Sequence, residues 1–453
     1  MVITSAAFSR LKTPMVLASL MGLRMLGLFM ILPVFALYGQ QLTGATPFLI
    51  GIAIGAYGLT QACLQIPFGW WSDRIGRKPV ILLGSIIFAV GALIAAQSHS
   101  IIGVIMGRAI QGGGAISSVL LAAISDVTEE EQRTKAMAMV GLFIGGSFML
   151  SFMIGPIWAA HWGLSGVFWL NVVLSLAGLI AAMIAVPSTR ERRTLRMDTK
   201  VNADHLWLLL KQPQLARVML SVWMLHLITT AVFVALPLAL VKQLHLPAIH
   251  HGWFYLPMML VSFAAIIPLV IIAEKKGSIK SILMTSLVLM SSGLILASQG
   301  FPWLSAFVDW FLYFAAFSCL EALLPSLASK LAPAGQKGSV MGLFSTAQFL
   351  GAFCGGVLGG TLLGRFGIHW SFLAAAGLVL FWLGVISTMA SPKLLQGHRL
   401  QLTDEQQADA VLDQLAQQTG IDDVVWVPTE KSIYVKYDKK LLTVQELEGF
   451  LAA

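Results

Sequence analysis

Residues 69–79 read Gly-Trp-Trp-Ser-Asp-Arg-Ile-Gly-Arg-Lys-Pro and join two apolar runs, 48–70 and 79–97. Each run is about twenty residues long, the length that a helix needs to cross a hydrocarbon core of ~30 Å. The sequence therefore predicts two membrane helices joined by a short, charged turn that contains two glycines. Few soluble folds would place such a turn between two runs of this length.

The composition of the whole chain agrees with a membrane protein. Of its 453 residues, 57% are hydrophobic and only 11% are charged, and the mean hydropathy is +0.82. That is more apolar surface than one soluble core can bury, so we expect the lipid bilayer as a partner. The formal charge of +8 does not indicate a nucleic acid partner, because the basic residues are spread over short loops between apolar runs.

Twelve apolar runs are long enough to span a bilayer, so we predict an all-α polytopic membrane protein. The predicted spans are 14–38, 48–70, 79–97, 101–124, 135–159, 166–187, 214–241, 250–273, 280–299, 303–327, 337–363 and 369–390. An even number of spans puts both termini on one side. If that side is the cytoplasm, only Lys242 and Arg365 among the basic loop residues face out, as the positive-inside rule requires.

The spans divide into two halves of six that carry a weak internal repeat. At an offset of 201 residues, Gly141-Leu142-Phe143 matches Gly342-Leu343-Phe344, and Arg108 stands opposite Asp309. Several matches at one offset favour a duplicated bundle with its site near the midplane between the halves. The predicted division is 1–187 for the first bundle, 188–213 for a linker, 214–390 for the second bundle and 391–453 for a further domain.

Residues 391–453 have the character of a small soluble domain. Thr403 and Gln406 can cap a helix that runs to about residue 418, and Thr443 and Glu446 can cap a second one. Alternating residues predict strands near 398–402, 424–427 and 433–437, which together give an α+β, ferredoxin-like order β-α-β-β-α. The layout resembles heavy-metal-associated domains without their cysteine pair, so no metal site is predicted.

The turn at 69–79 resembles the motif G-x-L-A-D-R-x-G-R-K of the major facilitator superfamily, with Trp71 and Ser72 in place of Leu and Ala. This resemblance implies alternating access between two bundles, with the motif as a conformational latch. We expect Asp73 to face the N-terminal end of the helix that starts near Lys337. The expected latch residues are Gly69, Asp73, Arg74, Gly76, Arg77, Lys78 and Asp126. Asp126 and the glutamates at 129–131 are the candidate acidic partners of the two arginines. The alternative is an ordinary loop that only sets the topology.

Two further stretches are similar to motifs of the superfamily. The run 107–114 resembles its R-x-x-Q-G motif, and Gly155-Pro156 resembles the core of its antiporter motif, although a generic packing helix explains that pair as well. The resemblance implies a drug:proton antiporter in a bacterial inner membrane, with cytoplasmic termini. Such a protein exports a small lipophilic compound in exchange for protons and needs no cofactor.

Five ionisable residues lie within the predicted spans, where an unpaired charge costs several kcal/mol. They are Glu321, Asp309, His226, Arg108 and Arg24. We rank Glu321 and Asp309 first as proton carriers, because a carboxylate that loses its water binds a proton more readily. His226 comes third, with a structural role as the favoured alternative, and Arg24 can pair with one of the acids. Arg108 either lowers the proton affinity of a nearby acid or binds backbone carbonyls.

The substrate cavity is expected to be apolar and aromatic, although core packing explains the same residues. The candidates are Phe29, Met30, Trp223, Phe233 and Tyr255. The sequence lacks a phosphate-binding loop, a catalytic triad and a metal-binding motif, which argues against an enzyme and against ATP as the energy source. Two alternatives stay open: a proton-coupled nutrient symporter, and a membrane sensor whose residues 391–453 bind a cytoplasmic ligand. One chain with two halves needs no second copy, so we expect a monomer.

Overall fold

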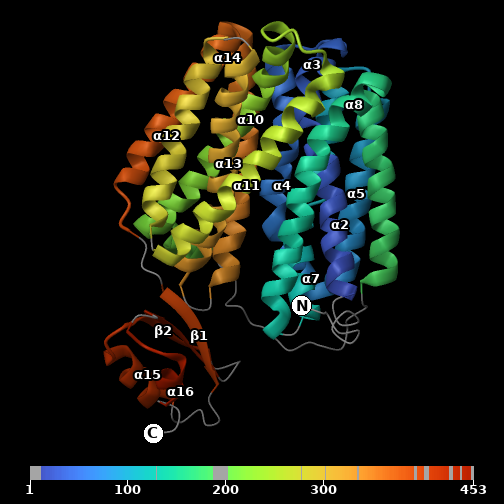
Figure 1. Cartoon of the computed structure of the whole chain (residues 1–453). Helices are drawn as coiled ribbons and strands as arrows, with labels where there is room; N and C mark the ends of the chain where they lie inside the picture. Colours follow the sequence, from blue (N-terminus) through green and yellow to red (C-terminus); the bar gives the residue numbers. More distant parts are fainter. Residues whose placement is uncertain are drawn as a thin grey trace, which may run out of the picture.

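The computed structural model is a bundle of long helices with a small α+β domain at one end (Figure 1). Helix α2 begins and helix α14 ends at the face of the bundle next to this domain; we call it the terminal face and its opposite the far face. The structure describes residues 12–128, 130–186, 203–276, 278–300, 303–333, 336–391, 395–401, 408–427, 432–438 and 441–449. Most of the predicted linker 188–213 therefore lies outside the described residues.

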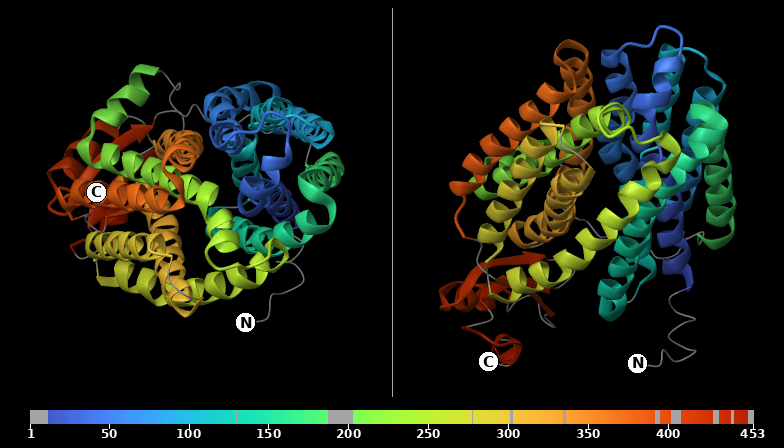
Figure 2. Two further views of the ribbon diagram at one scale, coloured as in Figure 1. Left: turned by 90° about the horizontal axis from the view of Figure 1, so that it is seen from above. Right: turned by 45° about the horizontal axis from the view of Figure 1, so that its top comes forward.

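The helices form two halves, which lie side by side when seen from above (Figure 2). The first half holds α2 (Lys12–Phe29), α3 (Leu32–Tyr38), α4 (Pro47–Ile75), α5 (Arg77–Gln97), α6 (Ile101–Gly113), α7 (Ser117–Val127) and α8 (Glu130–Ala185). The second half holds α9 (Ala203–Lys211), α10 (Pro213–Lys242), α11 (His251–Lys276), α12 (Ile279–Ser298), α13 (Trp303–Leu331) and α14 (Lys337–Ser387).

The predicted twelve crossings are confirmed. Nine stretches of the described residues are long and apolar enough to cross a membrane, and two of these, in α8 and α14, are 50 residues long. Each long stretch folds back at one glycine and crosses twice, and α11 supplies the remaining crossing. The folds lie at Gly163 (φ 64°, ψ −170°) and Gly367 (φ 78°, ψ −174°), a backbone that glycine adopts readily. The same bend in both halves supports the predicted duplication.

The predicted spans 14–38 and 101–124 are confirmed, and each of them is broken into two helices. Met30 and Ile31 separate α2 from α3, because Pro33 has no N–H to bond the preceding turn and its ring crowds that turn. Residues 114–116 separate α6 from α7, where a run of glycines weakens the helix. The signature turn is also shorter than predicted: only Gly76, with φ at 97°, stands between α4 and α5.

Glycines hold the two halves together near the far face. A Cβ on Gly51 of α4 would lie 2.0 Å from the carbonyl oxygen of Gly356 of α14. We call the contact the glycine seam; it comprises Gly51, Gly55, Gly58, Gly356 and Gly360. Towards the terminal face, a Cβ on Gly141 or Gly342 would meet no atom within 4 Å, and the two halves diverge there (Figure 1). The bundle is closed at the far face and open towards the terminal face.

The small domain has the predicted β-α-β-β-α order. Its elements are β1 (Leu395–Gln401), α15 (Ala408–Gln417), β2 (Ile421–Val427), β3 (Ser432–Asp438) and α16 (Val444–Gly449). The strands lie in the order β1-β3-β2, with β3 antiparallel to both neighbours. The predicted cap of α16 is confirmed: the Thr443 N–H donates to Glu446 Oε2 at 2.7 Å, which lowers the pKa of that carboxyl. The predicted Thr403 and Gln406 cap lies outside the described residues.

Substituting alanine in the glycine seam is expected to open the far face. The methyl group of Gly51→Ala cannot fit 2.0 Å from a carbonyl oxygen, so α4 and α14 must separate, at a cost of about 1–3 kcal/mol. Spin labels at Phe48 and Phe366, both exposed, should then show a longer distance in pulsed dipolar spectroscopy.

Gly141→Ala is the matched control, because it adds the same methyl group to a membrane helix where nothing lies within 4 Å. Equal label distances in the two variants would show that the seam does not hold the halves together.

Candidate functional site

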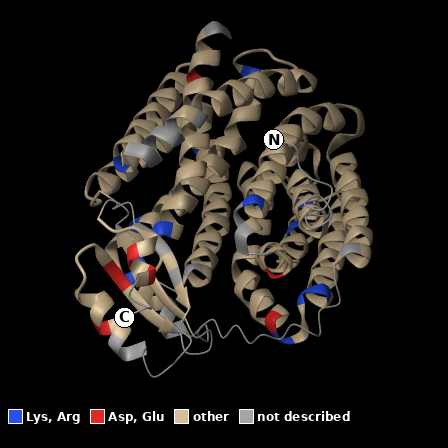
Figure 3. Ribbon diagram, turned by 60° about the horizontal axis from the view of Figure 1, so that its bottom comes forward, with Lys and Arg blue, Asp and Glu red and all other residues tan. Residues whose placement is uncertain are grey.

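The signature turn forms an ion-pair cluster on the terminal face. Arg77 Nε lies 2.9 Å from Asp126 Oδ2 at the end of α7, and Arg77 Nη1 lies 2.5 Å from Asp73 Oδ1. Arg77 Nη1 also donates to Ser72 Oγ at 2.6 Å. One guanidinium therefore joins the ends of α4, α5 and α7, as expected for Arg77 and Asp126. Figure 3 views the molecule with this end forward, where charged residues interrupt a largely uncharged bundle.

Other expected contacts of the latch are not made in this arrangement. Asp73 has 62% of its side chain exposed and pairs with Arg77, and among the described residues it does not meet the start of α14. Arg74 stacks on Trp70, with Cζ 3.6 Å from the ring centroid, and pairs with no carboxylate in the described part of the chain. A Cβ on Gly69 would meet only Ser118 Oγ, at 3.8 Å. A glycine at this position would let another helix approach closely, but among the described residues none does.

Arg108 of α6 is 2% exposed and binds backbone carbonyls. Its Nε and Nη2 donate to the carbonyls of Ala53 and Ile54, each at 3.3 Å, and its Nη1 donates to Gln111 at 3.2 Å. Its guanidinium also lies 5.2 Å from the centroid of the Tyr57 ring. Of the two roles considered for Arg108, these contacts match the binding of carbonyls, with no acid beside it among the described residues.

Arg24 of α2 has polar partners that carry no charge. Its Nη2 donates to Tyr57 Oη and to Gln61 Oε1, both at 3.2 Å, and no carboxylate of the described residues lies within 4.0 Å. The expected pairing of Arg24 with an acid is therefore wrong for this part of the chain. Gln61 in turn donates to Gln65 at 2.8 Å, which extends a polar ladder along α4.

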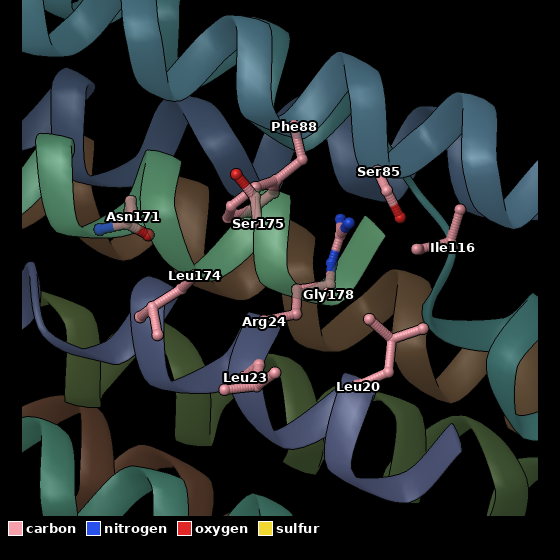
Figure 4. A pocket seen from close by; sticks show the side chains of 10 residues that line it. All are labelled: Leu20, Leu23, Arg24, Ser85, Phe88, Ile116, Asn171, Leu174, Ser175 and Gly178. Carbon is pink, nitrogen blue, oxygen red and sulfur yellow. The ribbon is translucent and has the colours of Figure 1, made fainter. Parts of the chain in front are cut away.

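A small pocket lies beside Arg24 inside the first half (Figure 4). It holds about 20 Å³, which is room for about one water molecule. The Arg24 guanidinium points across it towards Ser85, and Asn171 lies at its other end. Arg24 Nε and Asn171 Oδ1 are buried and have no hydrogen-bond partner among the described residues, so each can bind water there.

Glu321 and His226 meet in the second half, together with Gln348. His226 Nε2 of α10 lies 3.6 Å from Glu321 Oε2 of α13 and 2.8 Å from Gln348 Nε2 of α14. His226 Nδ1 lies 3.0 Å from the carbonyl of Val222, which can only accept, so Nδ1 carries a proton. Nε2 of the neutral ring then accepts from Gln348. Glu321 has 41% of its side chain exposed, whereas His226 has 15%.

Asp309 lies apart from this trio, towards the far end of α13. It is 3% exposed, and its side chain makes no ion pair or hydrogen bond with another described residue. Its backbone packs against α12, where a Cβ on Gly293 would lie 2.5 Å from the Asp309 carbonyl oxygen. The two acids that the sequence predicts on α13 therefore occupy different environments.

Aromatic side chains fill the middle of the bundle between the halves. Phe148 of α8 stacks on Phe317 of α13, with centroids 5.9 Å apart, and Phe152 of α8 packs on Phe233 and Tyr255 at 5.0 and 5.3 Å. We call this group the aromatic layer; it comprises Phe148, Phe152, Phe233, Tyr255, Phe314 and Phe317. Below the glycine seam, this layer is a second contact that crosses from one half to the other.

The expected cavity residues divide between packed and partly accessible positions. Met30, Phe233 and Tyr255 are 0% exposed, whereas Phe29 and Trp223 are half-buried. Phe29 packs edge-on against Phe148 of the aromatic layer at 4.9 Å. In the expected antiporter motif, a Cβ on Gly155 would lie 2.9 Å from the Met30 carbonyl oxygen, so Gly155-Pro156 lies against the break between α2 and α3.

Sequence reasoning missed the amides that complete these clusters. Gln61 and Gln65 lie one turn apart on α4, and Gln348 lies on α14, all within apolar spans. A glutamine inside a membrane helix needs a polar partner as a charge does. The glutamines within apolar spans are visible in the sequence, but their positions alone do not indicate which partner each amide binds.

Replacing Arg108 by lysine is expected to destabilise the first half. One ammonium cannot donate to two carbonyls and Gln111 at once, so buried acceptors lose their donors at a cost of about 2–4 kcal/mol. Thermal unfolding of the purified protein in detergent should show a midpoint lower by several degrees. Arg365→Lys, at an exposed position, is the control. Equal midpoints in the two variants would contradict the role of Arg108 as a carbonyl-binding hub.

Comparisons with known proteins agree with this architecture. The family model "Major Facilitator Superfamily" matches residues 17–353 and 218–401. The chain is 41% identical over 439 residues to the inner membrane transport protein YajR of Escherichia coli K12, and the match covers 95% of each chain. It is 25% identical over 339 residues to the multidrug resistance protein MdtH of Aeromonas hydrophila, and that match covers 74% of this chain and 84% of MdtH.

Solved structures show the same fold at low identity. A crystal structure of a variant of the nucleoside transporter NupG matches with a TM-score of 0.67 and 16% identity, covering 83% of this chain and 100% of that one. The resemblance to YajR extends into the small domain, since it covers 95% of both chains. The fold, the signature turn and these matches agree: the chain is a multi-pass secondary transporter that belongs to the Major Facilitator Superfamily.

Proposed function

We propose that this transporter exports a small lipophilic compound in exchange for protons by alternating access. The trio of His226, Glu321 and Gln348 carries the proposal, because an acid and an imidazole 3.6 Å apart within membrane helices can take up and release a proton. The terminal face is then the cytoplasmic face of a bacterial inner membrane, and the described arrangement is open to the cytoplasm. The chain works as a monomer, since both halves are present in one copy.

The trio has two hydrogen-bonding states that differ by one proton. In the neutral state, His226 Nδ1–H donates to the Val222 carbonyl and Nε2 accepts from the Gln348 amide. When a proton binds at Nε2, the ring N–H and the Gln348 N–H are both donors and cannot bond each other. The Gln348 amide must then turn so that its oxygen accepts from the ring. The same proton can pass to Glu321 Oε2. Protonation thus changes the contacts between α10, α13 and α14, which is what coupling to a conformational change requires.

The substrate class follows from the walls of the central region. The aromatic layer and the half-buried Phe29 and Trp223 offer apolar surface, and Glu321 is the partly exposed acid beside it. Such a wall favours a lipophilic solute over a sugar, whose hydroxyl groups need many polar partners. The similarity to MdtH, a multidrug resistance protein, supports export of this kind of compound.

Two alternatives can be separated from export. A proton-coupled nutrient symporter would move solute inward with the proton, so an uncoupler would abolish uptake instead of loss from the cell. A membrane sensor would show no flux at all, either in the full chain or after removal of residues 392–453. The antiporter is favoured because the similarity to a drug-resistance protein covers 74% of the chain.

Glu321→Gln is expected to abolish proton-driven export. The amide has the shape of the acid but cannot release a proton at physiological pH, so flux of a lipophilic fluorescent dye from reconstituted vesicles should no longer respond to a pH gradient. Purified Glu321→Gln should also release about tenfold fewer protons than the native protein when the dye is added. Asp309→Asn should have a smaller effect, because Asp309 does not contact His226.

Asp413→Asn, on the exposed surface of α15, is the matched control for the loss of a carboxylate. An unchanged proton stoichiometry in both the Glu321→Gln and the Asp309→Asn proteins would remove these acids as proton carriers.

A further inference from the structure

Among the described residues, Lys436 forms a contact between the small domain and the bundle. Lys436 Nζ of β3 donates to the carbonyl of Lys330 at 2.8 Å and to the carbonyl of Ala332. Both carbonyls lie at the terminal-face end of α13: Lys330 is within the helix, and Ala332 directly follows its last residue, Leu331. The last carbonyls of a helix lack partners within the helix and carry partial negative charge, so a lysine ammonium binds them favourably.

Lys436 lies on the face of the sheet that the helices of its own domain leave uncovered. Along β3, Ile433, Val435 and Tyr437 are at most 2% exposed and pack in one core with residues of α15 and α16. Successive side chains of a strand point to opposite faces, so Tyr434 and Lys436 point away from that core. In Figure 1 the sheet lies on the bundle side of α15 and α16, which agrees with this orientation.

The first half fastens the corresponding helix end with its own residues. The end of α7 is bound through Asp126, which lies 2.9 Å from Arg77 at the start of α5. At the offset of the internal repeat, Arg77 corresponds to Ser278 and Asp126 corresponds to Leu327. Neither residue can form an ion pair, so the second half has no counterpart of this contact at these positions. A cation does reach the end of α13, but it comes from the small domain.

We propose that the uncovered sheet face is a docking surface for the end of α13 and that the small domain acts as a gating element of the second half. Lys436 does for α13 what Arg77 does for α7: it holds the end of the helix at the open face of the transporter. α13 also carries Glu321, about two and a half turns before Lys330, so the fastened end helps to fix the position of Glu321 against His226. Through α13, the small domain thereby connects the terminal face, where the transporter opens, with the trio of His226, Glu321 and Gln348.

Hydrogen–deuterium exchange of the full chain in nanodiscs tests this proposal without knowledge of the substrate. In Lys436→Ala, amide exchange at the end of α13 should rise about three- to tenfold, because the helix end loses its capping donor. Lys436→Arg should keep the native exchange, since a guanidinium can donate to the same two carbonyls. The end of α7, bound by Arg77, should be unchanged in both variants and serves as the internal reference.

Two further proteins complete the test. Asp413→Asn changes the charge of the domain on α15, away from the sheet face, and should leave α13 unchanged. A chain ending at Ser391 lacks the domain altogether, so amide exchange at the end of α13 should rise in it as much as in Lys436→Ala. This comparison holds even if the Lys436→Ala substitution unfolds the small domain. Unchanged exchange in the truncated chain, or an equal rise in Lys436→Arg and Lys436→Ala, would overturn the proposal.

Discussion

A charge inside a membrane helix has to find a partner within the protein, and the interior of this transporter is organised around that requirement. Arg108 binds carbonyls of α4, and Arg24 binds Tyr57 and Gln61 of the same helix. Both arginines thereby connect other helices of the first half to α4. α4 also carries three of the glycines of the seam, which closes the far face. The hydrogen bonds of Arg24 and Arg108 therefore hold in place the helix on which this closure depends.

The two halves satisfy their polar groups in different ways although they share a fold. The interior of the described first half contains arginines bound by neutral oxygens, an arrangement that does not change with pH near neutrality because arginine stays charged. The interior of the second half contains the imidazole of His226 and the carboxylate of Glu321, which lie 3.6 Å apart. In the proposed exchange of compound for protons, a proton would therefore act on the second half and move it against the first.

The sequence predicted the fold well, because long apolar runs and a short charged turn leave few alternatives in a bilayer. It missed the breaks in the first and fourth spans, since hydropathy does not register the loss of a backbone hydrogen bond before Pro33 or within a run of glycines. In the candidate site, charge identified Asp126 as one of several candidate partners of Arg77, and the structure brings these two together. The partners of Arg24 and the meeting of His226 with Gln348 depend on how helices far apart in sequence are rotated, and no local pattern carries that information.

The bends at Gly163 and Gly367 have a consequence for how the chain enters the membrane. Each makes two successive crossings one continuous element with almost no loop on the far side, so no polar segment of any length has to be translocated there. With the terminal face on the cytoplasmic side, as proposed, the two arms of such a hairpin can insert together from the cytoplasm, and each covers part of the other. We therefore expect a bulkier residue at either bend to reduce the efficiency of membrane insertion before it affects the folded transporter.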